Sequence, residues 1–531
     1  MQGSEKKEQA TAVLAANGAP AGEPEVWNEN VEVYTPLKGN TPEPEPVWVS
    51  AEFAENFNVD TYLAEERQKD LLRFSTAGSV DDGKSTLIGR LLYDTQSVYD
   101  DQVRSIEGKG TTAPGVLDLA LLTDGLRAER EQGITIDVAY RYFATARRKF
   151  IIADTPGHEQ YTRNMATGAS TADVAVVLVD ARKGVLVQSR RHAYITALLG
   201  VRHVIVAVNK MDLVEYSEAV FTEIVREFRA FFDALDVDGH ECTTLHFVPV
   251  SALAGDNVVH ASGNMPWYAG RPLLALLESI PSSQIDAATP FRMAVQRVVR
   301  PNLDFRGFAG QIASGTLRVG DAVVALPSGK KSRVSRIVTF DGDLPEAFAP
   351  LSVTVVLEDE IDISRGDTLA AAGSAPALAH QLDASLVWMN EEPLDFSRRY
   401  LLKQGSRVVP ARVPQLRHVV NLTDASVAQE ETLRLNGIGA VVLETLQPLI
   451  FDRYADNRRT GSFVLIDPQS NATVAAGMLR GAAADTTTSA FEHVLDVTLD
   501  PSHALRLQGS EEAIAIAVDA LRKANLLKED A

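Results

Sequence analysis

One glycine-rich run constrains this chain more than any other feature of its sequence. Residues 78–85 spell Gly-x4-Gly-Lys-Ser, after an apolar run that begins at Phe74 and before a helical pattern that begins at Thr86. A loop with this spacing wraps phosphates with its backbone N–H groups, while its lysine reaches the terminal phosphates and its hydroxyl binds Mg²⁺. The sequence therefore predicts a strand, a phosphate-binding loop and a helix, in which Lys84 supplies a positive charge and Ser85 a magnesium ligand.

Four further short motifs follow the loop, and their order narrows the nucleotide to GTP. They are Gly-Ile-Thr-Ile at 133–136, Asp-Thr-Pro-Gly-His at 154–158, Asn-Lys-Met-Asp at 209–212 and Ser-Ala-Leu at 251–253. The carboxylate of Asp212 can accept hydrogen bonds from N1–H and the exocyclic amine of guanine, a donor pair that adenine lacks. A turn capped by Asp is the alternative interpretation of that stretch. The series as a whole predicts GTP binding, hydrolysis and a conformational switch.

The same motifs supply candidates for the chemistry. Asp154 suits a water-mediated contact to Mg²⁺, and Thr135 is the candidate switch hydroxyl on that ion. Gly157 can present its N–H to the γ-phosphate and tolerates a backbone rearrangement when this phosphate leaves. His158 is expected beside the γ-phosphate, where it would orient the attacking water, and a structural imidazole is the alternative. Since no arginine finger is evident, we expect slow hydrolysis until a partner completes the site.

The predicted site comprises three overlapping sets of residues. The catalytic set is Lys84, Thr135 and His158, and the magnesium set is Ser85, Thr135 and Asp154. The set expected to bind GTP or GDP is Gly78, Ser79, Val80, Asp81, Asp82, Gly83, Lys84, Ser85, Thr86, Asp154, Thr155, Pro156, Gly157, His158, Asn209, Lys210, Met211, Asp212, Ser251, Ala252 and Leu253.

Hydrophobic patterning predicts a doubly wound α/β domain that carries these motifs. Near-continuous apolar runs begin at Phe74, Phe150, Val174, Val204 and Phe247, as expected for strands buried on both faces of a mostly parallel sheet. Most of these runs lead into a motif at their carboxyl ends, where open α/β sheets bind ligands.

After about residue 281, short alternating runs and Gly-rich turns replace this pattern and predict two small β-barrels. The first residues are rich in Ala, Glu and Pro, a composition that buries too little surface to become ordered. The predicted order is a mostly disordered tail at 1–50, a lead-in helix at 51–72, a P-loop GTPase domain at 73–285, barrels at 286–378 and 379–480, and a linker with a C-terminal appendage at 481–531.

Composition and charge narrow the environment and the partners. The chain has a net charge of −20, which makes it a poor general binder of nucleic acid. No stretch approaches the ~18 consecutive apolar residues of a membrane span, and the N-terminus lacks the apolar core of a secretory signal, so we expect a cytoplasmic protein. The single cysteine, Cys242, is expected to be a small core residue. Arg-Arg-His at 190–192 is expected to form a polar, solvent-facing helix surface.

The motifs resemble those of the translation-factor GTPase superfamily, in which a GTP-binding domain precedes two β-barrels. A finer similarity is to the GTPase (large) subunit of bacterial heterodimeric sulfate adenylyltransferase, over roughly residues 60–480. Asp82 is a useful discriminator, because elongation factors usually place His or Ser at that point of the loop. The stretches that carry this finer similarity are 79–94, 128–143, 150–170, 264–268, 300–306, 338–343 and 435–439.

The resemblance implies a function shared between two subunits. A separate small subunit would make adenosine 5′-phosphosulfate and pyrophosphate from ATP and sulfate, and this chain would couple GTP hydrolysis to that unfavourable reaction. Such a heterodimer, or a higher assembly, would perform the first step of sulfate assimilation towards cysteine. Neither nucleic acid nor a membrane is an expected partner.

Two other functions stay open on the sequence alone. An elongation factor that delivers aminoacyl-tRNA would have the same domain order, although Asp82 and the stretch Asn-Met-Pro-Trp-Tyr at 264–268 argue against it. A scaffold that binds GTP without hydrolysing it is disfavoured because Thr135 and His158 are both present.

Overall fold

The computed structural model forms two compact units, which divide between Lys69 and Asp70. It describes residues 30–33, 47–50, 69–106, 117–123, 137–157, 162–235, 237, 242–282, 289–302, 305–421, 424, 426–483, 493–500 and 503–509. In the first unit β1 (Asn30–Val33) pairs antiparallel with β2 (Val47–Ser50). These strands interrupt the segment predicted to be disordered, and the rest of that segment lies outside the described residues.

The second unit begins with a strand where the sequence predicted the end of a helix. β3 (Asp70–Ala77) pairs in parallel with β5 (Arg148–Asp154), so residues 70–72 of the predicted lead-in helix are extended. Leu72 and Phe74 point into the core, and their burial favours the strand over a continuing helix. Residues 51–68 of that predicted helix lie outside the described part of the chain.

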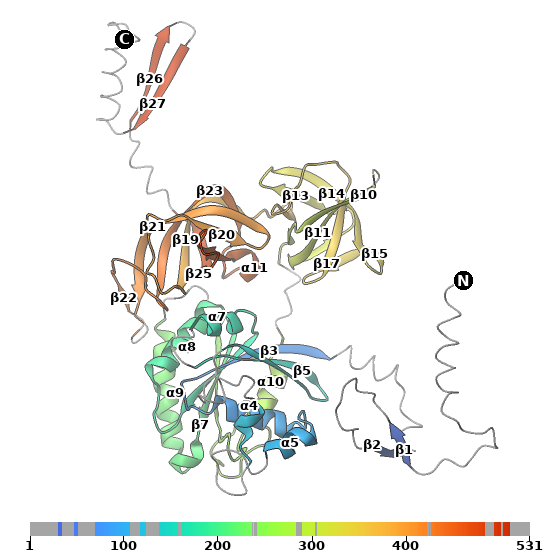
Figure 1. Cartoon of the computed structure of the whole chain (residues 1–531), viewed down its shortest axis with the longest axis vertical. Helices are drawn as coiled ribbons and strands as arrows, with labels where there is room; N and C mark the ends of the chain where they lie inside the picture. Colours follow the sequence, from blue (N-terminus) through green and yellow to red (C-terminus); the bar gives the residue numbers. More distant parts are fainter. Residues whose placement is uncertain are drawn as a thin grey trace, which may run out of the picture. The chain divides into compact units, whose positions relative to one another are not determined.

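A six-stranded sheet forms the centre of the first domain of this unit (Figure 1). Its order is β4-β5-β3-β6-β7-β8, and only the edge strand β4 runs antiparallel to its neighbour. The central strand β6 is buried along its whole length, in accordance with its continuous apolar sequence. The remaining bounds are β4 (Ala139–Ala144), β6 (Val174–Asp180), β7 (His203–Asn209) and β8 (Thr244–Pro249).

Helices cover both faces of this sheet. One face packs against α4 (Lys84–Asp94) and α10 (Leu273–Ser279), and the other against α7 (Thr162–Ser170), α8 (Val187–Leu198) and α9 (Glu218–Asp233). Alternate residues of β6 and β7 enter the two cores, because successive side chains of a strand point to opposite faces. The shorter helical elements are α5 (Asp100–Ile106), η1 (Leu119–Leu122) and η3 (Met211–Val214).

Two closed β-barrels follow, so the predicted fold class is confirmed. In the first barrel β11 pairs with both β9 and β17, which closes the ring β9-β11-β17-β14-β13-β18. Its strands are β9 (Arg292–Ala294), β10 (Arg297–Asn302), β11 (Phe305–Ser314), β12 (Thr316–Arg318), β13 (Ala322–Leu326), β14 (Lys330–Thr339), β15 (Gly342–Leu344), β16 (Glu346–Phe348), β17 (Ser352–Leu357) and β18 (Thr368–Ala371).

The second barrel closes in the same way, since β20 pairs with both β21 and β24. Its elements are β19 (Ala377–Trp388), β20 (Tyr400–Gln404), β21 (Arg407–Val420), β22 (Val427–Ala428), β23 (Ile438–Phe451), α11 (Arg458–Gly461), β24 (Ser462–Ile466) and β25 (Thr473–Ala482). Beyond it β26 (His493–Asp500) and β27 (His503–Gly509) form an antiparallel pair.

Two further predictions concern the single cysteine and membrane spans. Cys242 is exposed, so its prediction as a core residue is wrong. It lies just before β8, the edge strand of the sheet, where few neighbours can cover it. Among the described residues no helix is both long and apolar enough to cross a lipid bilayer.

Arg148 fixes the start of β5 and gives a first testable prediction. Its buried guanidinium donates to the carbonyls of Leu277 and Ile280, at 2.9 and 2.5 Å, and pairs with Asp70 at 2.5 Å. Arg148→Met leaves these two carbonyls without their donor, so we expect a loss of about 2–3 kcal/mol in the free energy of unfolding. Urea unfolding measures it.

Arg147→Met is the matched control for this substitution. The Arg147 side chain is 79% exposed and lies 3.5 Å from Glu278, so its loss should change the free energy of unfolding by less than about 0.5 kcal/mol. Equal effects of the two substitutions would contradict the structural role given to Arg148.

Candidate functional site

The phosphate loop connects β3 to α4, and its backbone takes up a conformation that requires glycine. Gly83 precedes α4 with φ of 89°, in the left-handed region. A Cβ atom added there would lie 2.5 Å from Nδ2 of Asn209, so a side chain has no room. The loop therefore packs directly on the guanine motif that begins at Asn209, although the two are far apart in the sequence.

Gly157 lies against the same loop from the other side. A Cβ atom added to Gly157 would lie 2.4 Å from the carbonyl oxygen of Gly78 and 3.4 Å from Nζ of Lys84. The structure thus places the backbone of the Asp-Thr-Pro-Gly motif beside the lysine that was predicted to reach the terminal phosphates. A backbone N–H beside a lysine ammonium is a pairing that suits a phosphate group.

Asp154 ends β5 and is fixed by a neighbouring strand. It is almost fully buried, and its Oδ1 accepts a hydrogen bond from Oγ1 of Thr76 at 3.2 Å. The next residue, Thr155, donates its hydroxyl to the carbonyl of Thr76 at 2.6 Å. These contacts tie the carboxyl end of β5 to that of β3, where the phosphate loop starts.

The base-recognition motifs are joined to the phosphate loop by one side chain. Nδ2 of Asn209 donates to the carbonyl of Asp82 at 2.8 Å, and its Oδ1 accepts the backbone N–H of Ala252 at 3.0 Å. Because Asn209 is 1% exposed, both bonds are shielded from water. Nε of Arg90, from α4, also donates to the carbonyl of Ala252 at 3.2 Å. The phosphate loop, the Asn-Lys-Met-Asp motif and the Ser-Ala-Leu motif are thereby held at fixed positions relative to one another.

Lys210 has the left-handed backbone conformation, with φ of 65°, and points back across the loop. Its Nζ lies 3.1 Å from Oδ2 of the buried Asp180 and donates to the carbonyl of Asp81. Burial opposes ionisation of Asp180, but hydrogen bonds from Arg182 and Lys210 outweigh it and lower the pKa of this carboxyl. The resulting ionised Asp180 holds the lysine stem across the phosphate loop.

Asp82 distinguishes this loop chemically. Its carboxylate is buried, and Oδ2 accepts the backbone N–H of Ser79 at 2.6 Å. Burial raises the pKa of Asp82, against the hydrogen bond from Ser79 and the charge of Lys183. The side chain thus braces the turn of the loop from within.

The structure brings most of the predicted site together at the carboxyl edge of the sheet. The four motifs lie at the carboxyl ends of β3, β5, β7 and β8, as expected for an open α/β sheet. They comprise residues 78–86, 154–157, 209–212 and 251–253. Thr135 and His158 lie outside the described residues.

Sequence reasoning missed several residues that support this site. Asp180 ends the apolar run of β6. A carboxylate at the carboxyl end of a central strand was the signal in the sequence that could have found it. Gln188 of α8 donates to the carbonyl of Gly157 at 3.1 Å. The predicted solvent-facing surface at 190–192 is wrong for His192, which is 1% exposed because it lies on the flank of α8 that packs inward with Ser189, Ala193 and Thr196.

Part of the predicted magnesium set fits a hard divalent cation. Ser85 is the second residue of α4, next to Lys84, and Asp154 supplies a buried carboxylate at the end of β5. Oxygen donors of this kind suit Mg²⁺, which usually combines one or two protein ligands with phosphate oxygens and water. In the part of the chain that the structure describes, no cluster of three or more His, Cys, Asp and Glu side chains could hold a metal by itself.

The fold and this geometry define a guanine-nucleotide-binding domain of the elongation-factor type. Residues 69–296 match the elongation factor Tu GTP binding domain, 309–370 match elongation factor Tu domain 2, and 381–480 match the GTP-eEF1A C-terminal domain-like family. These matches support binding of a guanine nucleotide by the first domain.

Relatives at high identity specify the family further. "Sulfate adenylyltransferase subunit 1" of Shewanella oneidensis is 56% identical over 81% of this chain and 89% of that protein. The protein of the same name from Photobacterium profundum is 55% identical over 82% of this chain and 92% of its own length. "Bifunctional enzyme CysN/CysC" of Rhodopirellula baltica is 52% identical, with coverage of 86% and 71%. The chain belongs to the sulfate adenylyltransferase subunit 1 family, and the resemblance noted in the sequence is confirmed.

Gly83 provides a sharp test of the phosphate loop. Gly83→Ala places a methyl group against Asn209 at a positive φ, so we expect affinity for GDP and GTP to fall roughly 100-fold, equivalent to about 3 kcal/mol. Titration with fluorescent guanine nucleotides measures the loss.

Gly320→Ala separates backbone strain from this clash. Gly320 lies in the first barrel with a φ of 91°, close to that of Gly83, but no heavy atom lies within 4 Å of its Cβ position. Nucleotide affinity in this control should stay within about twofold of the parent protein, since strain away from the site acts on stability rather than binding. A Gly83→Ala protein that binds nucleotide normally would contradict the described packing of the loop on Asn209.

Proposed function

We propose that this chain is the GTP-hydrolysing subunit of a sulfate adenylyltransferase. It couples GTP hydrolysis to the formation of adenosine 5′-phosphosulfate and pyrophosphate from ATP and sulfate on a partner subunit. The observation that carries this proposal is the packing of Gly157 against Lys84 in a chain whose relatives bear that enzyme's name. This packing gives a nucleotide site that can distinguish GTP from GDP.

Each predicted residue then has a definite task. Lys84 and the N–H groups of the loop hold the β- and γ-phosphates, and Gly157 donates its N–H to the γ-phosphate. Asp212 accepts the two N–H donors of the guanine edge, and the backbone N–H of Ala252 donates to Asn209 rather than to the base. Asn209 keeps these groups in register with the phosphate loop.

Hydrolysis needs a positioned water and neutralised charge. His158 orients the attacking water, and Thr135 closes over the γ-phosphate. Ser85, Thr135 and Asp154 would hold Mg²⁺, which when bound neutralises charge on the phosphate oxygens. Since phosphoryl transfer depends on positioning and electrostatics, a partner that orders the switch residues would raise the rate.

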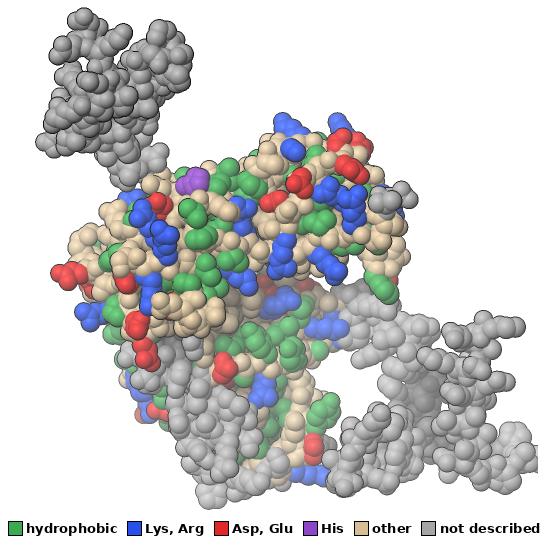
Figure 2. Space-filling view, turned by 45° about the horizontal axis from the view of Figure 1, so that its top comes forward, with side chains coloured by type: hydrophobic (Ala, Val, Ile, Leu, Met, Phe, Trp, Pro, Cys, Tyr) green, Lys and Arg blue, Asp and Glu red, His purple; other side chains and the backbone are tan. Residues whose placement is uncertain are grey.

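The wider organisation follows from the same proposal. The partner is a small subunit that carries the ATP and sulfate site, in a heterodimer or higher assembly that works in the cytoplasm. The domain boundaries predicted from the sequence, at 73–285, 286–378 and 379–480, are part of this proposal. On the barrel face drawn in Figure 2, basic and acidic side chains are interspersed rather than gathered into one basic groove, an arrangement that does not favour a tRNA-delivering factor.

The base contact predicts a change in nucleotide preference. Inosine triphosphate lacks the exocyclic amine of GTP, so the intact protein should bind GTP roughly 10- to 100-fold more tightly than inosine triphosphate. Asp212→Ala should remove most of this preference, because the carboxylate that accepts the amine is gone. Competition against fluorescent GDP measures both affinities.

The exposed Asp233 at the end of α9 supplies the control. Asp233→Ala should keep the preference of the parent protein for GTP. A preference that survived Asp212→Ala would assign base recognition to another residue and sink this part of the proposal.

The coupled reaction itself is tested with the switch residue. Mixed with the cognate small subunit, ATP and sulfate, the chain should hydrolyse GTP faster and stimulate pyrophosphate release. Thr135→Ala should lower both rates by at least about tenfold while GDP affinity stays within a few-fold, since the hydroxyl acts only when the γ-phosphate is present. Stimulation by charged tRNA instead of the small subunit would favour the elongation-factor alternative.

A further inference from the structure

The helix α8 touches the nucleotide site with one end and the second barrel with the other. It runs over Val187–Leu198, a rigid rod about 18 Å long. In its first turn, Nε2 of Gln188 donates to the carbonyl of Gly157 at 3.1 Å. At its far end, the hydroxyl of Tyr454 in the second barrel donates to the carbonyl of Leu199 at 3.0 Å, in a buried position.

The orientation of the Gln188 amide is determined by its neighbours. The carbonyl of Gly157 can only accept, and Nη1 of Arg191 can only donate, to Oε1 of Gln188 at 3.3 Å. Both contacts require the same amide orientation. The Nε2 of Gln188 is also 3.0 Å from Nε2 of His192, so this ring nitrogen must act as the acceptor.

His192 is thereby held neutral, with its proton on Nδ1. Burial, together with the charges of Lys84 and Arg191, lowers the pKa of His192 to about 3. Its Nδ1 is buried and has no hydrogen-bond partner among the described residues. An unsatisfied buried donor is costly, so packing alone gives little reason for a histidine here, whereas support of Gln188 does.

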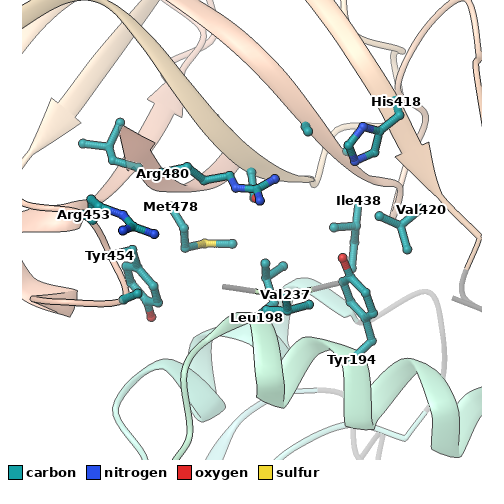
Figure 3. A pocket seen from close by; sticks show the side chains of 15 residues that line it. Tyr194, Leu198, Val237, His418, Val420, Ile438, Arg453, Tyr454, Met478 and Arg480 are labelled. Atoms are coloured by element: carbon teal, nitrogen blue, oxygen red, sulfur yellow. The ribbon is translucent and has the colours of Figure 1, made fainter. Parts of the chain in front are cut away.

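The far end of α8 belongs to a continuous apolar contact with the second barrel. Tyr194 and Leu198 share one hydrophobic cluster with Ile438, Tyr454 and Met478. Figure 3 shows Tyr194 and Leu198 on the helix side of a small cavity that Ile438 and Met478 line from the barrel side. Around this cavity the shared apolar cluster keeps the helix in contact with the barrel, so a displacement of α8 reaches side chains of the barrel.

We propose that Gln188, supported by His192, is a positioning residue that ties Gly157 to α8, and that α8 passes the position of Gly157 to the second barrel through Leu199 and Tyr454. Loss of the γ-phosphate releases the N–H of Gly157, and the resulting backbone movement shifts or breaks the bond from its carbonyl to Gln188. This inference rests on the proposed role of Gly157 in GTP recognition and adds the route by which the barrel senses it.

The test compares the full-length chain bound to a non-hydrolysable GTP analogue and to GDP. Hydrogen exchange should differ between the two states in peptides around Tyr454. Gln188→Met keeps the length of the side chain but removes its polar atoms. It should abolish this difference and reduce the ratio of analogue to GDP affinity about fivefold or more, with GDP affinity unchanged. Val187→Ala, at an exposed position of the same turn, should change neither quantity.

Tyr454→Phe tests the other end, and removes only the hydroxyl that donates to Leu199. It should weaken the exchange difference in the barrel and leave the affinity ratio intact. A barrel response that persists fully in both Gln188→Met and Tyr454→Phe would overturn the proposal, as would its absence from the parent protein. Should Gln188→Met fail to fold, Tyr454→Phe alone decides the route. A parent protein that binds neither nucleotide would instead refute the proposed function.

Discussion

The hydrogen bonds of Asn209 are the interactions on which the rest of the nucleotide site depends. One side chain accepts from the Ser-Ala-Leu loop and donates to the phosphate loop, while its own backbone begins the motif predicted to recognise guanine. Since it is buried at the carboxyl ends of β3, β7 and β8, it sets the distance between the base and phosphate halves of the site. The glycine at position 83 follows from this packing, because Nδ2 of Asn209 fills the space of a Cβ.

Gly157 makes a second set of contacts at the nucleotide site. Its backbone touches the phosphate loop and Lys84 on one side and Gln188 on the other. The first contact suits recognition of a γ-phosphate, and the second connects that event to α8 and the second barrel. A GTPase that drives chemistry on another subunit needs such a connection, because a change at its nucleotide site has to be passed on beyond its own domain.

Much of this architecture could be predicted from the sequence, for identifiable reasons. The apolar run of β6 is buried on both faces, so its composition predicts a central parallel strand, and the motif spacing locates the loop between β3 and α4. The supporting contacts could not be predicted. His192 follows two arginines in the sequence, and only the rotation of α8 against the sheet makes it buried. The helix predicted at 51–72 runs too far at its C-terminal end, because the burial of Leu72 depends on pairing with β5, a long-range interaction.

The central claim is that free energy from GTP reaches the sulfate-activating reaction. The most direct measurement is the amount of adenosine 5′-phosphosulfate formed at long times by the two subunits with ATP and sulfate, with and without GTP and without pyrophosphatase. The account predicts that the product exceeds its equilibrium level while GTP is being hydrolysed, and falls back when GTP is exhausted. If GTP made the product form faster but left its final level unchanged, GTP would activate the reaction without driving it. That result would contradict the account.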